Sequence, residues 1–149
     1  MVATMCFKQF QNLTVFLLLL LCVAGCSQPP EPGPDVSWDD LTKQENQQQR
    51  VAVTGFLKVP TSIMATDTML LPLHQTEEDE SPKVSCSVKI GSGPNMAETP
   101  PKNYKESDLV LLDKDGNRVA PNSKIKVTGK LVAGEATTLL MGPLLIEKL

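Results

Sequence analysis

The chain has 149 residues, 41% of them hydrophobic and 21% charged, which suits one globular domain with a short appendage and leaves no room for a second core. Aromatic residues make up only 4%, so the core must be built from Val, Leu, Ile and Met. With 17 acidic against 14 basic residues and few rings to stack on bases, nucleic acid is not an expected partner.

Residues 1–25 have the pattern of a secretory signal peptide. The apolar run over 13–25 is shorter than the ~20 residues that a bilayer span needs. Lys8 and the amino terminus precede it, and 1–25 contain no acidic residue. Prolines at positions 29, 30, 32 and 34 would end any helix soon after the run. We therefore expect cleavage, with an uncleaved anchor helix as the alternative.

The apolar run ends in Val23-Ala24-Gly25-Cys26. This resembles the lipobox of bacterial lipoprotein precursors, in which a branched apolar residue and two small residues precede a cysteine. The resemblance implies that signal peptidase recognises Val23, Ala24 and Gly25. It also implies that Cys26 becomes the first residue of the mature protein, carrying a diacylglyceryl group and usually an amide-linked fatty acid such as palmitate. Two or more acyl chains anchor a protein stably. The expected location is the cell membrane or the outer membrane, with the domain facing the periplasm or the cell exterior.

The four cysteines do not indicate a disulfide framework. Two of them, Cys6 and Cys22, leave with the signal peptide, and the lipobox resemblance assigns Cys26 to the lipid. A disulfide or metal pair of Cys22 and Cys26 is disfavoured because no other thiol or nearby histidine completes a ligand set. Cys86 shares the predicted strand face of Val84 and Val88, so we expect it to be buried and inert.

Residues 26–49 are expected to form a Pro-rich tether. Extended at ~3.1 Å per residue, its 24 or so residues would reach roughly 75 Å. The pattern around Ser37 predicts a short helix over 38–48 inside this tether, which would shorten that reach. Trp38 and Leu41 share one face of that helix and could dock on the domain or bind a partner protein. Docking is the favoured interpretation.

Residues 50–149 carry the strand signals. Alternating apolar residues predict strands over 51–58, 69–73, 84–90, 125–132 and 137–146, the last interrupted by Gly142-Pro143. The first and fourth contain nearly the same phrase, Val-Ala-Val-Thr-Gly-Phe-Leu and Ile-Lys-Val-Thr-Gly-Lys-Leu. A glycine in mid-strand favours a bend, so Gly55 and Gly129 indicate a tightly curved sheet.

The region between residues 90 and 124 is less regular. Residues 91–103 are typical of a loop, and 104–112 fit either a strand or a short helix. Asp115-Gly116 is a tight-turn signal. The surrounding Asp113-Lys-Asp-Gly-Asn117 does not match a calcium loop, because Arg118 stands at the position that requires glycine. We expect a turn there and no metal.

The five strands, the mid-strand glycines and the insertion after the third strand resemble the OB-fold, a compact five-stranded barrel. The resemblance covers most of residues 50–149. The sequence therefore predicts a mainly β protein, with a small five-stranded OB-like barrel following a signal peptide and a Pro-rich tether. A small β-sandwich is the alternative.

The sequence contains no motif of an enzyme. His74 is the only histidine, and no nucleophile motif, Gly-rich phosphate loop, C-x-x-C pair or H-E-x-x-H helix is present. We expect no catalysis and no cofactor. The acidic run over 77–80 is expected to be a solvated hairpin loop rather than a cation site.

Three lysines, Lys124, Lys126 and Lys130, are predicted to face outward from the fourth strand. They could bind an anionic partner such as a cell-wall polymer or a lipid headgroup, or only keep an exposed strand soluble. The sequence predicts a membrane-anchored envelope lipoprotein that acts as a non-catalytic binding or interaction module, with an envelope protein or an anionic cell-wall component as partner. The alternative is a structural or assembly lipoprotein that engages a partner protein through the Trp38 segment.

Overall fold

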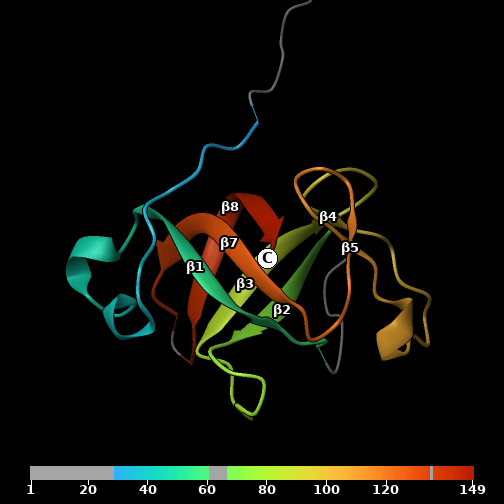
Figure 1. Ribbon diagram of the computed structural model, residues 1–149, viewed down its shortest axis with the longest axis horizontal. Coiled ribbons are helices and arrows are strands. Elements are labelled where there is room, and N and C mark those ends of the chain that lie inside the picture. The colour runs from blue at the N-terminus through green and yellow to red at the C-terminus, as the bar shows by residue number, and fades with distance from the viewer. Residues whose placement is uncertain (1–28, 61–66, 135) are drawn as a thin grey trace, which may run out of the picture.

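A computed structural model describes residues 29–60, 67–134 and 136–149 of the chain (Figure 1). The described elements are strands and single turns of 3-10 helix. In chain order they are η2 (Trp38–Asp40), η3 (Gln44–Asn46), β1 (Arg50–Leu57), β2 (Thr68–His74), β3 (Val84–Ile90), β4 (Met96–Ala97), η4 (Glu106–Asp108), β5 (Leu111–Leu112), β6 (Arg118–Val119), β7 (Lys124–Val132) and β8 (Thr138–Lys148).

Five of these strands close into a barrel. Each strand pairs with the next in the order β1, β2, β3, β8, β7 and back to β1. All of these pairs are antiparallel except β3 with β8, which run parallel. The mainly β fold and the small OB-like barrel are therefore confirmed, and the β-sandwich alternative is wrong because the sheet closes on itself.

The two similar strand phrases pair with each other in the barrel wall. β1 and β7 are antiparallel, with Val53 opposite Val127 at the centre. A methyl group added at Gly55 would lie 2.5 Å from the carbonyl oxygen of His74, and one added at Gly129 would lie 2.5 Å from Cδ2 of Leu144. Both glycines thus allow neighbouring strands to approach more closely than a side chain permits. The prediction of a tightly curved sheet is confirmed.

The insertion between β3 and β7 adds three short strands to the same sheet. β4 lies parallel to the end of β3, and β5 and β6 follow it as antiparallel neighbours. The segment 104–112 contains both structures that its sequence allowed, the turn η4 and the strand β5. The predicted tight turn is present: the carboxylate of Asp113 accepts hydrogen bonds from the main-chain N–H groups of Asp115 and Asn117.

The barrel interior is the hydrophobic core. Its largest fully buried side chains are Leu, Ile, Val and Met, as the low aromatic content predicts. Cys86 lies among them with 1% of its surface exposed, and burial raises the pKa of its thiol to about 12. The prediction of a buried cysteine on the face of Val84 and Val88 is confirmed.

The segment 29–49, here called the N-terminal arm, packs along the barrel instead of forming a free tether over its whole length. Its strand-like part runs beside β1: Val36 donates from its main chain to Ala52, and Ala52 donates to Pro34. Leu41 is part of the core, with 2% of its surface exposed. In Figure 1 the arm descends beside β1 before its two 3-10 turns.

The expected helix over 38–48 is wrong, because the arm forms only the two short turns η2 and η3. The chain between and after them is extended at Lys43 and left-handed at Gln48, whose φ is 64°. The backbone groups of Gln48 and Gln49 bond to Leu131 of β7, so they are not available to extend a helix.

Candidate ligand-binding face

The three lysines singled out by the sequence lie on the outer surface of β7, but they do not form one free cationic patch. Lys126 pairs with Asp35 of the N-terminal arm, with Nζ 2.9 Å from Oδ1, and this hydrogen-bonded contact raises the pKa of the lysine. Lys124 lies over the ring of Phe56, 6.0 Å from its centroid. Lys130 is exposed, and the buried Thr128 separates it from Lys126.

Trp38 docks on the barrel, as the favoured interpretation predicted. Its indole Nε1 donates a hydrogen bond to the carbonyl of Thr54, and its ring packs against the core. Because Leu41 is buried as well, this segment presents no continuous exposed patch. The structure therefore offers no support for a partner site built on the Trp38 segment.

The predicted lipidation site Cys26 and the residues Val23, Ala24 and Gly25 lie outside the described residues. Within the part of the chain that is described, none of the helical segments has the length and apolarity to span a membrane.

A more promising surface is the outer side of β2 and β3, here called the β2–β3 face. Alternation sends Met69, Leu71 and Leu73 into the core and leaves the residues between them on the outside. Leu70 stands in the middle of this outer row, opposite Ser87 of β3, with 55% of its surface exposed. A single exposed leucine needs no explanation by itself, but this one stands in a row that has a hollow at each end.

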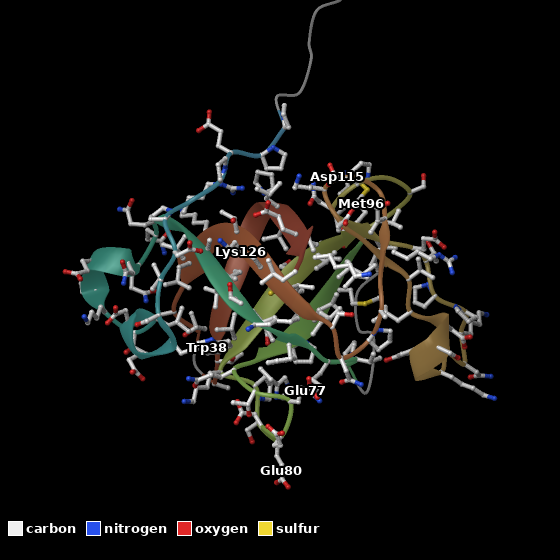
Figure 2. All side chains as sticks on the ribbon, in the orientation of Figure 1. Trp38, Glu77, Glu80, Met96, Asp115 and Lys126 are labelled. Atoms are coloured by element: carbon white, nitrogen blue, oxygen red, sulfur yellow. The ribbon has the colours of Figure 1, made fainter. Side chains whose placement is uncertain are left out.

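One hollow of about 470 Å³ lies at the end of the face where the β2–β3 loop turns back. We call it the acidic hollow, because Asp79 and Glu80 of that loop form one part of its lining. His74 and Ser85, from the ends of β2 and β3, and Lys58, just after β1, form another. Figure 2 shows Glu77 and Glu80 on this loop, at the far side of the barrel from Met96 and Asp115.

A second hollow of about 820 Å³ lies at the opposite end of the face, and we call it the seam groove. It lies where β8 leaves β3: the two strands pair only as far as Cys86 and Leu140, and β8 then bends at Gly142, whose φ is 86°. Lys89 of β3 and Leu144 of β8 line it. Pro29 and Pro30 of the N-terminal arm also contribute to its wall.

The residue types of a serine hydrolase meet in the acidic hollow, since His74, Ser85 and Asp79 all line it. They are not linked as a triad. No hydrogen bond joins any two of these three described residues, and the carboxylate of Asp79 instead accepts a bond from the main-chain N–H of Thr76. Nucleophilic catalysis requires a nucleophile that is hydrogen-bonded to its general base, and a base that is held by a third group. The arrangement in the acidic hollow therefore gives no support for a hydrolase.

The chemistry of the face is aliphatic in the middle and charged at both ends. Among the described residues, neither hollow is lined by Phe, Tyr or Trp, so neither provides a stacking platform for a base or a sugar. The described residues also include no group of three or more His, Cys, Asp or Glu side chains that could hold a metal ion. The face thus combines one exposed aliphatic side chain with two hollows that have charged residues in their linings.

Sequence reasoning missed this face, although it contained one signal. In Met69-Leu70-Leu71 an apolar residue occupies the outward position of an alternating strand, where a polar residue is expected. The two hollows had no such signal, because each is built from segments far apart in the chain. No protein-family model, curated protein or solved structure matches the chain, so the functional conclusion rests on the barrel's own surface.

Proposed function

We propose that this protein is a lipid-anchored, non-catalytic binding module of the bacterial cell envelope, and that it holds another envelope protein on its β2–β3 face. The observation that carries the proposal is the exposed Leu70, placed between two hollows on that face. OB-like barrels bind their ligands on the surface of the second and third strands. The analogy with OB-like barrels and the position of Leu70 thus both favour the β2–β3 face.

A protein segment suits this face better than a cell-wall polymer does. Protein interfaces have an apolar centre and a polar rim, and the face has Leu70 at its centre and charged side chains at both ends. The outer row from Thr68 to His74 spans about 20 Å at ~3.3 Å per residue, which accommodates an extended segment of about six residues. The lysines on β7 would favour an anionic polymer, but Asp35 already neutralises one of them.

Attachment to the membrane is supported by the resemblance of Val23-Ala24-Gly25-Cys26 to a lipobox. Mass spectrometry of the membrane-bound protein tests it, and we expect a mature chain that begins at lipid-bearing Cys26. The matched variant is Cys26→Ser, which should be uncleaved and unacylated. An amino terminus at Met1, or membrane retention unaffected by Cys26→Ser, would contradict the lipid anchor.

The binding face can be tested with a photoreactive amino acid placed at position 70 in the native host. We expect a discrete protein adduct from position 70 and none from position 130, which is exposed on the outer surface of β7. A charge in the centre of the face, Leu70→Glu, should abolish the same partner's binding while the circular dichroism of the barrel is unchanged. Adducts of equal yield from both positions, or no adduct at position 70, would refute the proposal.

A further inference from the structure

The lining of the seam groove differs in polarity from segment to segment. The N-terminal arm and the bend of β8 contribute apolar residues, which are Pro29, Pro30, Pro143 and Leu144. The ends of β2 and β3 contribute polar residues, which are Asp67, Thr68, Ser87 and Lys89. A groove of about 820 Å³ with such a lining has the size and the mixed polarity of a site for an amphiphilic molecule.

One side chain of β1 joins the two apolar segments of the groove. Nε of Arg50 donates a hydrogen bond to the main-chain carbonyl of Glu31, next to Pro30, at 2.6 Å. Nη1 of the same guanidinium donates to the main-chain carbonyl of Pro143 at 2.8 Å. The arm and the bend of β8 are therefore held together before any ligand binds, and a preformed site costs less free energy to fill.

The polar part of the groove carries two opposite charges that the protein does not pair. Lys89 and Asp67 are both exposed, and neither forms a salt bridge with another described residue. The main-chain carbonyl of Asp67 accepts a hydrogen bond from the N–H of Ile90, which keeps Asp67 beside the end of β3. Lys114 also lines the groove, but its Nζ lies 3.2 Å from a carboxylate oxygen of Asp115. The charges left for a ligand are thus one cation and one anion.

The position of the groove in the chain indicates where such a ligand would come from. Pro29 lines the groove, and only two residues separate it from Cys26. A lipid on Cys26 would therefore hold the groove against the surface of the bilayer. Figure 2 shows Met96, which also lines the groove, at the end of the barrel opposite to Glu77 and Glu80.

We propose that the seam groove binds one phospholipid of the membrane, with a headgroup that carries a phosphate and a primary ammonium. The inference rests on the proposed function in taking Cys26 to be acylated. The phosphate bonds to the ammonium group of Lys89, and the headgroup ammonium donates to the carboxylate of Asp67. The glycerol and the first part of the acyl chains pack against Pro143, Leu144 and the prolines of the arm.

The test uses amide NMR spectra of the full chain, purified in micelles of a non-ionic detergent. The probe is dihexanoylphosphatidylethanolamine. Its analogues are dihexanoylphosphatidylcholine, whose quaternary ammonium has no N–H donor, dihexanoylphosphatidylglycerol, which has no cation, and glycerophosphoethanolamine, which has no acyl chain. We expect saturable shifts of the amide resonances of Lys89 and Leu144 with the ethanolamine lipid, weaker binding of all three analogues, and no shift at Lys130 on β7.

Two variants with opposite effects on net charge separate the site from general electrostatics. Lys89→Gln removes the partner of the phosphate, and Asp67→Asn removes the partner of the ammonium. Each should weaken binding of the ethanolamine lipid by about threefold or more, because both pairs are partly exposed to water. A general charge effect on the anionic glycerol lipid would instead have opposite signs in the two variants. The control Lys130→Gln removes an exposed charge outside the groove and should leave binding unchanged.

The phospholipid site is refuted by a folded protein that shows no saturable shift, or by wild-type affinity in both Lys89→Gln and Asp67→Asn. Equal affinity for glycerophosphoethanolamine would also refute it, because the site would then recognise a soluble headgroup and not a lipid. The proposed function fails on other results. A saturable response in a chain whose Cys26 carries no lipid supports the phospholipid site and refutes the lipid anchor, whereas an acylated chain without a response refutes the phospholipid site alone.

Discussion

The indole Nε1 of Trp38 donates a hydrogen bond to the main-chain carbonyl of Thr54 across 2.9 Å. Thr54 belongs to the part of β1 that has β7 on one side and lacks β2 on the other, since β2 pairs only with Phe56 and Leu57. An open strand edge is a site of unwanted pairing. Trp38, together with the bridge from Asp35 to Ala52, covers that edge with the protein's own chain.

Two substitutions at Trp38 should separate the hydrogen bond from the packing. Trp38→Phe keeps most of the ring contact but leaves the Thr54 carbonyl unpaired, so the free energy of unfolding should fall by about 1–2 kcal/mol. Trp38→Ala also loses the packing, and the total loss should be roughly 3 kcal/mol. Urea unfolding followed by circular dichroism measures both, because the sequence has no second tryptophan for fluorescence. A Phe variant as stable as the original would show that the hydrogen bond contributes nothing.

Gly55 should not tolerate even a methyl group. The added Cβ would lie 2.5 Å from the carbonyl oxygen of His74 and 2.8 Å from Cζ2 of Trp38, so both a strand and the packed indole would have to shift. We expect Gly55→Ala to lower the free energy of unfolding by about 1–3 kcal/mol. The control is Gly91→Ala, whose only close neighbour is the flexible Met96 side chain. Equal losses for the two variants would argue against this close contact as the cause.

Cys86 should not react with thiol reagents while the barrel is folded. Burial raises its pKa to about 12, and the reactive form is the thiolate. In a variant with Cys6, Cys22 and Cys26 replaced by Ser, we expect no labelling by a disulfide reagent near pH 8 and complete labelling in concentrated urea. Rapid labelling without urea would mean that the core opens readily around β3.

Asp113 should make the stability of the barrel sensitive to acid. Burial alone would raise the pKa of this carboxyl, but hydrogen bonds from the main chain of Asn117 and Asp115 outweigh it, and the pKa is lowered. A group with a lowered folded-state pKa stabilises the fold above its unfolded-state pKa of about 3.9, and this contribution disappears as the pH falls through the folded-state value.

Asp113→Asn is the matched variant, because asparagine keeps one oxygen acceptor but cannot titrate. The variant should be less stable than the original chain near pH 7, and the difference should shrink as the pH falls below about 4. Urea midpoints of both proteins across this range provide the measurement. A difference that stays constant with pH would mean that the carboxylate charge is not what stabilises the turn.

The barrel could be predicted from the sequence because its signals are local. Alternation, the mid-strand glycines at positions 55 and 129 and the Asp115-Gly116 turn each depend on neighbours within a few residues. These are features in which local preference and the final fold agree. The pairing of β1 with β7 is not among them, because two similar strand sequences do not specify that the strands are neighbours.

The N-terminal arm and the acidic hollow could not be predicted in this way. The pattern around Ser37 favours a helix, but the backbone groups of Gln48 and Gln49 bond to Leu131, which is more than 80 residues away in the sequence. His74 and Asp79 are close in sequence, yet the hollow they line also needs Lys58, just after β1, and Ser85 of β3. Tertiary contacts of this kind have no local signal.

The docked arm also changes how far the barrel can stand from a lipid on Cys26, if that residue is acylated as proposed. Between Cys26 and Pro29, which already lines the seam groove, the chain can extend only about 10 Å at ~3.4 Å per residue. A fully extended tether of residues 26–49 would have allowed roughly 75 Å. The seam groove would then lie next to the headgroups, and the acidic loop of Glu77 and Glu80 would point away from them (Figure 2). The β2–β3 face would then be confined to a thin layer above the bilayer. This confinement raises its effective concentration relative to partners that are bound to the same membrane.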